Sequence, residues 1–227
     1  MATNALTITD TTIGKKAVMA VSGLVLFGFV IVHMLGNLQI FLGPQTFNDY
    51  SLFIHQSRGV LWGARAVLLL AVTAHIVTAA QLYFRNKTAR PSRYKVKKNL
   101  ATSYAARVMY LSGPLLLLYI VYHIAHLTLG VTTGLGYDHA ASPGGPVDVY
   151  HNVVSSFRVE WLVGIYVVAQ IFLGLHIYHG AWSLFQSLGI NHRRYNEPLR
   201  NAASALALAT VAGFLAVPIG VYAGWVV

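Results

Sequence analysis

The sequence contains no cysteine, and this absence excludes disulfide bonds, thiolate catalysis and iron–sulfur ligation by this chain. Charged residues are also scarce, at 10% of 227 residues against about a quarter in a soluble domain. Hydrophobic residues make up 56% of the chain. The N-terminus lacks the pattern of a cleaved signal peptide, so we expect it in the mature chain. The composition indicates a polytopic membrane protein, with residues 1–227 forming one bundle.

Five apolar segments have about the 20-residue length that a helix needs to cross a bilayer. They cover residues 17–41, 61–84, 105–130, 161–186 and 202–225. The predicted fold class is therefore all-α, an integral membrane bundle of five transmembrane helices. Pro114 and Pro218 fall inside two of these segments, where neighbouring helices can satisfy the freed carbonyls. The connection 131–157 is rich in glycine and proline around 142–146 and is predicted to be irregular.

The formal charge of +10 is distributed unevenly over the predicted connections. If the helices alternate, most basic residues share one side with the N-terminus: Lys15, Lys16, Arg85, Lys87, Arg90, Arg93, Lys95, Lys97, Lys98, Arg107, Arg193, Arg194 and Arg200. Arg58, Arg65 and Arg158 lie on the other side. This bias predicts a cytoplasmic N-terminus and an outer C-terminus in a bacterial cytoplasmic membrane. It also favours contact with membrane lipid, or a soluble partner protein, over nucleic acid.

Histidine occurs inside four of the five apolar segments, where ionisable side chains are costly and mark functional sites. His33 and His123 lie 17 and 16 residues from the basic flanks at Lys16 and Arg107. His75 and His176 each lie 10 residues from the flank of their own segment. At 1.5 Å per residue, these counts place the histidines in two layers, about 25 Å and about 15 Å from the inner surface.

Two layers, each with one imidazole from two different helices, suit two haems with histidine on both sides of the iron. From spacing alone, a proton relay or transporter is the alternative, because intramembrane histidines also serve those roles. Tyrosine and tryptophan are predicted to form the interface belts of a membrane protein. The remaining histidines are predicted to be solvated loop residues, with a loop metal site as the alternative: His55, His139, His151 and His192.

The order and spacing of several short motifs resemble the cytochrome b membrane subunit of succinate dehydrogenases and fumarate reductases. The resemblance is to the single-chain, five-helix, two-haem type, and it covers nearly the whole chain. The matching pieces are His33-Met-Leu-Gly-Asn37, Ala74-His75, Ser112-Gly113 with His123 ten residues later, and His176-Ile-Tyr-His179-Gly180-Ala-Trp182-Ser183. Family-like spacing selects His123 over His126 and His176 over His179 as ligands. His126 and His179 then become supporting or packing residues.

The resemblance implies that this chain anchors complex II, an enzyme of the tricarboxylic acid cycle, and carries its electrons. A flavoprotein subunit would oxidise succinate and an iron–sulfur subunit would relay electrons to two haem b groups here. His33 and His123 would hold the outer haem iron, and His75 and His176 the cytoplasm-side haem iron. A membrane quinone, expected to be menaquinone, would exchange these electrons. No catalytic residue for succinate is expected in this chain, which has no flavin domain.

Two further sets of candidates follow from the chemistry of these cofactors. Haem propionates need cationic or hydroxyl partners, and the candidates are Ser22, Lys16, Arg107, Arg65 and Arg158. The quinone candidates in the first outer connection are Asn48, Gln56 and Arg58. The family's acidic residues do not map clearly, since Gly174 stands two residues before His176.

Two rival functions remain at the level of sequence. A second five-helix, two-haem anchor, of the nitrate reductase type, would also bind haem, but the spread of histidines over four helices favours complex II. A haem-free proton-coupled transporter would be expected to show repeated halves with broken helices, which this sequence does not display.

Overall fold

A computed structural model of the chain describes residues 7, 10–89, 92, 102–131 and 147–227. These residues form helices and connections, with no strand among them. The five long helices are α1 (Thr12–Leu38), α3 (Arg58–Thr88), α4 (Tyr104–His123), α6 (Glu160–Ser187) and α7 (Asn196–Tyr222). Each is long and apolar enough to cross a membrane. The prediction of an all-α bundle with five transmembrane helices is confirmed.

The long helices begin earlier than the predicted apolar runs, and in α1 and α4 a polar side chain caps the start. The Thr11 hydroxyl accepts a hydrogen bond of 2.9 Å from the Gly14 N–H at the start of α1. Ser103 accepts one of 3.2 Å from Ala106 at the start of α4. Such caps satisfy backbone donors that have no partner within the helix. As a result Lys15 lies inside the first turns of α1, where its ammonium donates to Gln81 of α3 at 2.7 Å.

Two shorter helices, α2 (Pro44–Gln56) and α5 (Val149–Phe157), were not predicted. The prediction of an irregular connection is therefore wrong for the part that α5 occupies, whereas residues 132–146 lie outside the described part. Asp148 caps α5 by accepting a hydrogen bond of 2.9 Å from the His151 N–H. Val153, Val154 and Phe157 are buried. Capping and burial of this apolar side explain why the segment is helical.

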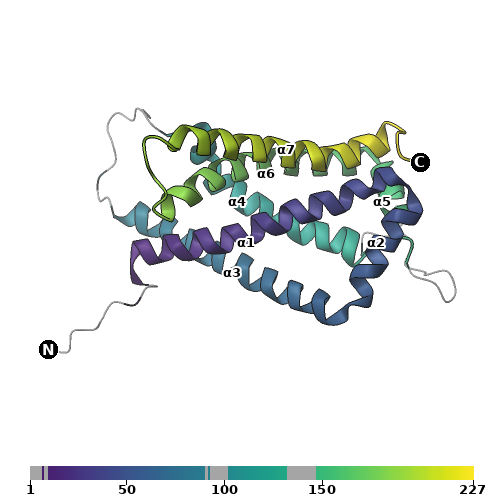
Figure 1. The fold of residues 1–227 in the computed structure, drawn as a ribbon, viewed down its shortest axis with the longest axis horizontal. Helices are drawn as coiled ribbons and strands as arrows, with labels where there is room; N and C mark the ends of the chain where they lie inside the picture. The colour runs from purple at the N-terminus through teal and green to yellow at the C-terminus, as the bar shows by residue number, and fades with distance from the viewer. Residues whose placement is uncertain (1–6, 8–9, 90–91, 93–101, 132–146) are drawn as a thin grey trace.

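The long helices lie side by side, with α2 and α5 at one end of the bundle (Figure 1). The start of α1 and the end of α7 lie at opposite ends, as an odd number of crossings requires (Figure 1). Helix α1 packs against α3, α4 packs against α6, and α7 packs against both α6 and α1. By contrast, α1 with α4 and α3 with α6 are not among the closely packed helix pairs of the described chain.

A compact apolar core fills the end of the bundle that carries α2 and α5. It contains Ile40, Phe47, Tyr150, Val153, Val154, Phe157, Tyr166, Val217, Val221 and Val226. Its members come from both short helices as well as from α6 and α7. This end is therefore tightly packed next to the predicted outer layer of histidines.

Candidate functional site

Four histidines of the long helices form two ring pairs. His33 of α1 and His123 of α4 have ring centroids 5.8 Å apart, with ring planes at 81°. His75 of α3 and His176 of α6 have ring centroids 6.2 Å apart, with ring planes at 56°. These are the two pairings that the depth count predicted. We call them the 33/123 pair and the 75/176 pair.

The spacing of the rings fits a metal ion held between them. An imidazole nitrogen binds a first-row metal at about 2 Å, so two rings on opposite sides of one ion have centroids about 6 Å apart. Both pairs meet this condition, and each joins two helices that do not pack closely together. No group of three or more histidine and carboxylate side chains able to hold a metal occurs in the described part of the chain. Each pair would therefore supply two protein ligands, which is the number that a haem iron takes.

The ring of His75 rests against helix α1. Its Nδ1 atom lies 3.1 Å from the Met19 carbonyl oxygen and 3.4 Å from the Ser22 hydroxyl. A carbonyl can only accept, so Nδ1 of His75 carries the proton and Nε2 keeps its lone pair. Gly23 provides the space, because a Cβ there would lie 3.2 Å from Cε1 of His75. Metal-binding histidines usually show this arrangement, with the second nitrogen donating to a protein acceptor.

The partner ring, His176, has a polar contact with helix α4. Its Nδ1 atom lies 3.4 Å from the hydroxyl of Ser112, which is fully buried. Ser112 belongs to the Ser112-Gly113 motif of the sequence, so the motif contributes to the surroundings of the 75/176 pair. His179, one turn further along α6, is half-buried.

Aromatic rings pack around His33. Phe29 stacks on it with centroids 5.3 Å apart and planes at 13°, and Phe214 of α7 lies 5.8 Å away. Its Nε2 atom lies 3.5 Å from the Asn37 amide, one turn along the same helix. The ring is thus positioned mainly by apolar contacts, unlike the other three histidines.

His126 has hydrogen-bonding partners on both ring nitrogens. It is 1% exposed, with Nδ1 2.9 Å from the Tyr166 hydroxyl and Nε2 3.1 Å from the Ser156 hydroxyl. It lies in a π-helical turn, Ile124–Thr128, that follows α4 directly. Such turns often occur at functional sites. Because both nitrogens of His126 are occupied, the geometry favours His123 as the metal ligand.

A group of buried polar side chains adjoins the 33/123 pair. The rings of Tyr119 and Tyr166 lie 5.7 and 5.8 Å from that of His123, and Gln170 donates to the Tyr119 hydroxyl at 3.3 Å. The Tyr122 hydroxyl and Gln170 Oε1 are buried without a hydrogen-bond partner in the described chain. The prediction that tyrosines serve as interface belts is wrong for these three, which contact one another and the histidines. The sequence feature that could have indicated these contacts is the occurrence of tyrosine at the same depth as histidine in the apolar segments.

Most of the candidates for the haem propionates contact residues other than the paired histidines. Ser22 is the exception, since it approaches His75, although its hydroxyl donates to the Val18 carbonyl at 2.7 Å. The guanidinium groups of Arg65 and Arg107 lie over the rings of Trp62 and Tyr104. Lys16 in α1 and Arg158 at the end of α5 are exposed.

The quinone candidates lie at the end of the bundle with the short helices, and they do not converge. Gln56 and Arg58 are exposed at the junction of α2 and α3. Asn48 instead ties α2 to α5, since its amide donates to Asp148 at 2.9 Å and accepts from the Tyr150 N–H at 3.0 Å. Partial burial opposes the ionised form of Asp148, but the His151 N–H and the Asn48 amide outweigh it and lower the pKa of this carboxyl.

The other histidines that the structure describes are solvent-exposed, as predicted, but the prediction that they lie in loops is wrong for His55 and His151, which lie in α2 and α5. His55 in α2 has Nδ1 2.7 Å from the Ser51 carbonyl oxygen, and His151 and His192 are also exposed. His139 lies outside the described residues. So do five of the basic residues between α3 and α4: Arg90, Arg93, Lys95, Lys97 and Lys98.

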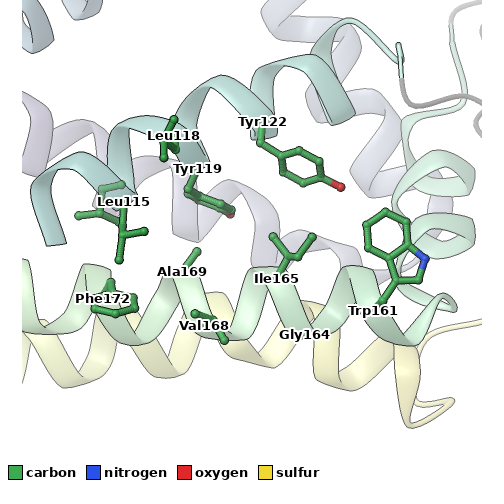
Figure 2. Close-up of a pocket in the computed structure, with 11 residues that line it drawn as sticks. Leu115, Leu118, Tyr119, Tyr122, Trp161, Gly164, Ile165, Val168, Ala169 and Phe172 are labelled. Atoms are coloured by element: carbon green, nitrogen blue, oxygen red, sulfur yellow. The ribbon is translucent and has the colours of Figure 1, made fainter. Parts of the chain in front are cut away.

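An apolar groove of about 530 Å³ runs between α4 and α6 (Figure 2). From α4 it is lined by Leu115, Leu116, Leu118, Tyr119 and Tyr122, and from α6 by Trp161, Gly164, Ile165, Val168, Ala169 and Phe172. Its wall includes Tyr119, whose ring packs on His123. The groove suits a hydrocarbon chain, and one aromatic ring separates it from the 33/123 pair.

Gly174 allows α6 and α7 to pack closely. A Cβ atom at this position would lie 2.6 Å from Cγ2 of Val211 in α7, so a larger side chain requires Val211 or the helices to shift. An acidic side chain two residues before His176 is thus incompatible with this packing.

Comparison of the chain with family models, curated proteins and solved structures found no match.

Proposed function

We propose that this protein is a two-haem cytochrome b that anchors a succinate:quinone oxidoreductase in a bacterial cytoplasmic membrane. The observation that carries the proposal is the pairing of four intramembrane histidines from four different helices. In each pair the ring centroids lie at about the distance expected when one metal ion is held between two imidazoles. His33 and His123 would hold one haem b, and His75 and His176 the other. The N-terminus would face the cytoplasm, so the 75/176 pair would lie nearer to it.

Each haem would supply a one-electron carrier, and the chain's own residues would position it. The Met19 carbonyl and the Ser112 hydroxyl would orient the ligands of the 75/176 pair. Two haems within one bundle would make this chain an electron path across the membrane. Since it has no cysteine, a separate iron–sulfur subunit would deliver electrons, and a separate flavoprotein subunit would act on succinate.

The quinone, which we expect to be menaquinone, would bind beside the 33/123 pair. The groove between α4 and α6 supports this location, since it is apolar and its Tyr119 wall packs on His123. Exposed side chains of α6, such as Trp161 and Val168, border it, so a membrane-dissolved molecule could enter from the side. Asn48, Gln56 and Arg58 do not line this groove.

Two alternative functions would use the same residues differently. A haem-free proton-coupled transporter would have no need for two ring pairs spaced at metal distance. A two-haem anchor of the nitrate reductase type would share the haems but associate with different soluble subunits. The site geometry favours haem binding over transport, whereas the partner subunits separate the two anchors.

The deciding experiment is purification of the chain from its native membrane under mild detergent. We expect two haem b per chain by pyridine haemochrome assay, a low-spin visible spectrum, and co-purification of a flavoprotein and an iron–sulfur protein with succinate dehydrogenase activity. A colourless protein would refute haem binding. A haem protein with molybdenum-containing partners would instead support the nitrate reductase type.

A further inference from the structure

A single hydrogen-bonded chain connects His123 with the short helix α5. Nδ1 of His123 lies 3.2 Å from the Tyr166 hydroxyl, which lies 2.9 Å from Nδ1 of His126. Nε2 of His126 lies 3.1 Å from the Ser156 hydroxyl. That hydroxyl lies 2.6 Å from the Asn152 carbonyl oxygen. We call these four side chains, with the terminal carbonyl, the 123–156 chain.

The last link of the 123–156 chain fixes the direction of the others. The Asn152 carbonyl can only accept, so the single hydroxyl proton of Ser156 is donated to it. Ser156 therefore accepts a hydrogen bond from Nε2–H of His126. His126 is neutral, because its polar partners are two uncharged hydroxyls and a buried unpaired charge is costly. Its Nδ1 atom consequently has no proton and accepts.

The same reasoning extends to His123. Tyr166 has one hydroxyl proton, which it donates to Nδ1 of His126, so its oxygen accepts from Nδ1–H of His123. A neutral His123 with its proton on Nδ1 keeps the lone pair on Nε2. That lone pair is what a metal ion requires.

We propose that Tyr166, His126 and Ser156 are positioning residues that hold His123 in its metal-binding tautomer and strengthen it as a ligand to the outer haem. This inference rests on the proposed function. An acceptor on the second nitrogen fixes the orientation of a ligating imidazole and raises its basicity. A more basic ligand stabilises ferric over ferrous iron, so the chain lowers the midpoint potential of the outer haem relative to that of the same haem without it.

The test compares two tyrosine-to-phenylalanine variants of the purified two-haem protein. Tyr166→Phe removes the link between His123 and His126 and keeps the ring. Tyr119→Phe is the matched control: its ring also packs on His123, but its hydroxyl is bonded to Gln170, outside the 123–156 chain. Ser156→Ala interrupts the chain at its far end, without altering a ring that packs on His123.

In Tyr166→Phe we expect a redox titration to show a higher midpoint potential for one haem and no change for the other. The electron paramagnetic resonance signal of that haem should shift, and its affinity should fall about 10- to 100-fold in competition with a haem-scavenging protein. Ser156→Ala should raise the same potential by less, and Tyr119→Phe should leave it unchanged.

Unchanged potentials and spectra in both Tyr166→Phe and Ser156→Ala would refute the positioning role, as would an equal change in Tyr119→Phe. If Tyr166→Phe does not assemble, Ser156→Ala decides the question against the same control. Failure of the underlying function is distinguishable, because it would leave the wild-type protein itself without haem.

Discussion

The rings of His75 and His176 lie 6.2 Å apart although their helices, α3 and α6, do not pack closely against each other. The two side chains thus approach each other although the backbones of their helices do not. The Nδ1 atom of each ring is directed to an acceptor on a further helix, the Met19 carbonyl of α1 and the Ser112 hydroxyl of α4. All four helices that carry the paired histidines therefore contribute to this one pair, which makes it sensitive to substitutions on any of them.

The first prediction concerns the haem ligands. His75→Ala or His176→Ala should remove one haem and leave the other, and His33→Ala should remove the opposite one, because each iron would lose one of its two protein ligands. Haem content and spectra of the purified variants measure this. His179→Ala is the control and should retain both haems.

For the substitution of His123, the matched control is substitution of His126, three residues further along the chain. His123→Ala should remove the outer haem, whereas His126→Ala should leave its iron low-spin. Two intact low-spin haems in His123→Ala would overturn the assignment and identify His126 as the ligand.

The second prediction concerns orientation. The excess of lysine and arginine on the side of the α6–α7 connection predicts that this connection faces the cytoplasm. The absence of cysteine allows single cysteines to be introduced at the exposed positions Asn191 and Gln56. An impermeant thiol reagent added to intact cells should label Gln56→Cys and should label Asn191→Cys only after lysis. The reverse pattern would invert the proposed topology.

The third prediction concerns the soluble partner subunits. Neutralising Arg93, Lys95, Lys97 and Lys98 together should let these subunits leave the membrane at lower salt, with both haems retained. Clustered cations attract an acidic partner surface, and salt screens exposed charges beyond about 8 Å at physiological ionic strength. Arg58 and Arg158, on the opposite side, provide the control. An unchanged salt requirement would mean that these cations serve topology and lipid contact only.

The fourth prediction concerns the groove between α4 and α6. Gly164 lines it, and a Cβ there would have no atom within 4 Å, so Gly164→Phe should fill the groove without disturbing the backbone. We expect a higher KM for quinone with both haems retained, because a blocked site weakens substrate binding. Gly28→Phe on α1, which also has open space around it, is the matched control. Equal kinetics in the two variants would place the quinone elsewhere.

The fifth prediction concerns the cap of α5. Asp148→Ala should lower the free energy of unfolding by about 1 kcal/mol, as is usual for loss of a helix cap. The pKa of Asp148 is lowered in the fold from an ordinary 3.8, so its stabilisation is present above that pH and is lost as the pH falls through the folded value. Asp148→Asn should keep the cap but lose this pH dependence. Thermal unfolding of both variants between pH 3 and pH 7, relative to wild type, measures the effect.

The sequence by itself determined the five long helices and the position of each histidine along its helix. Both follow from local regularities: the apolar length needed to cross a bilayer, and the constant rise of a helix, which converts residue counts into depth. For this reason the pairing of His33 with His123 and of His75 with His176 could be predicted without coordinates. The start of α1 was missed by a few residues, because its cap, Thr11, lies outside the apolar pattern.

The spacing of the sequence selected His123 over His126, but only the tertiary structure supplied a physical reason for that choice. His123 and His126 differ by less than one helical turn in sequence, and their difference lies in contacts with Tyr166 and Ser156, which are 30 to 43 residues away. The helical form of α5 and the link from Asn48 to Asp148 depend on the same kind of distant contact. Hydrogen bonds between helices depend on how the helices are rotated and packed, and no periodicity within a single segment contains that information.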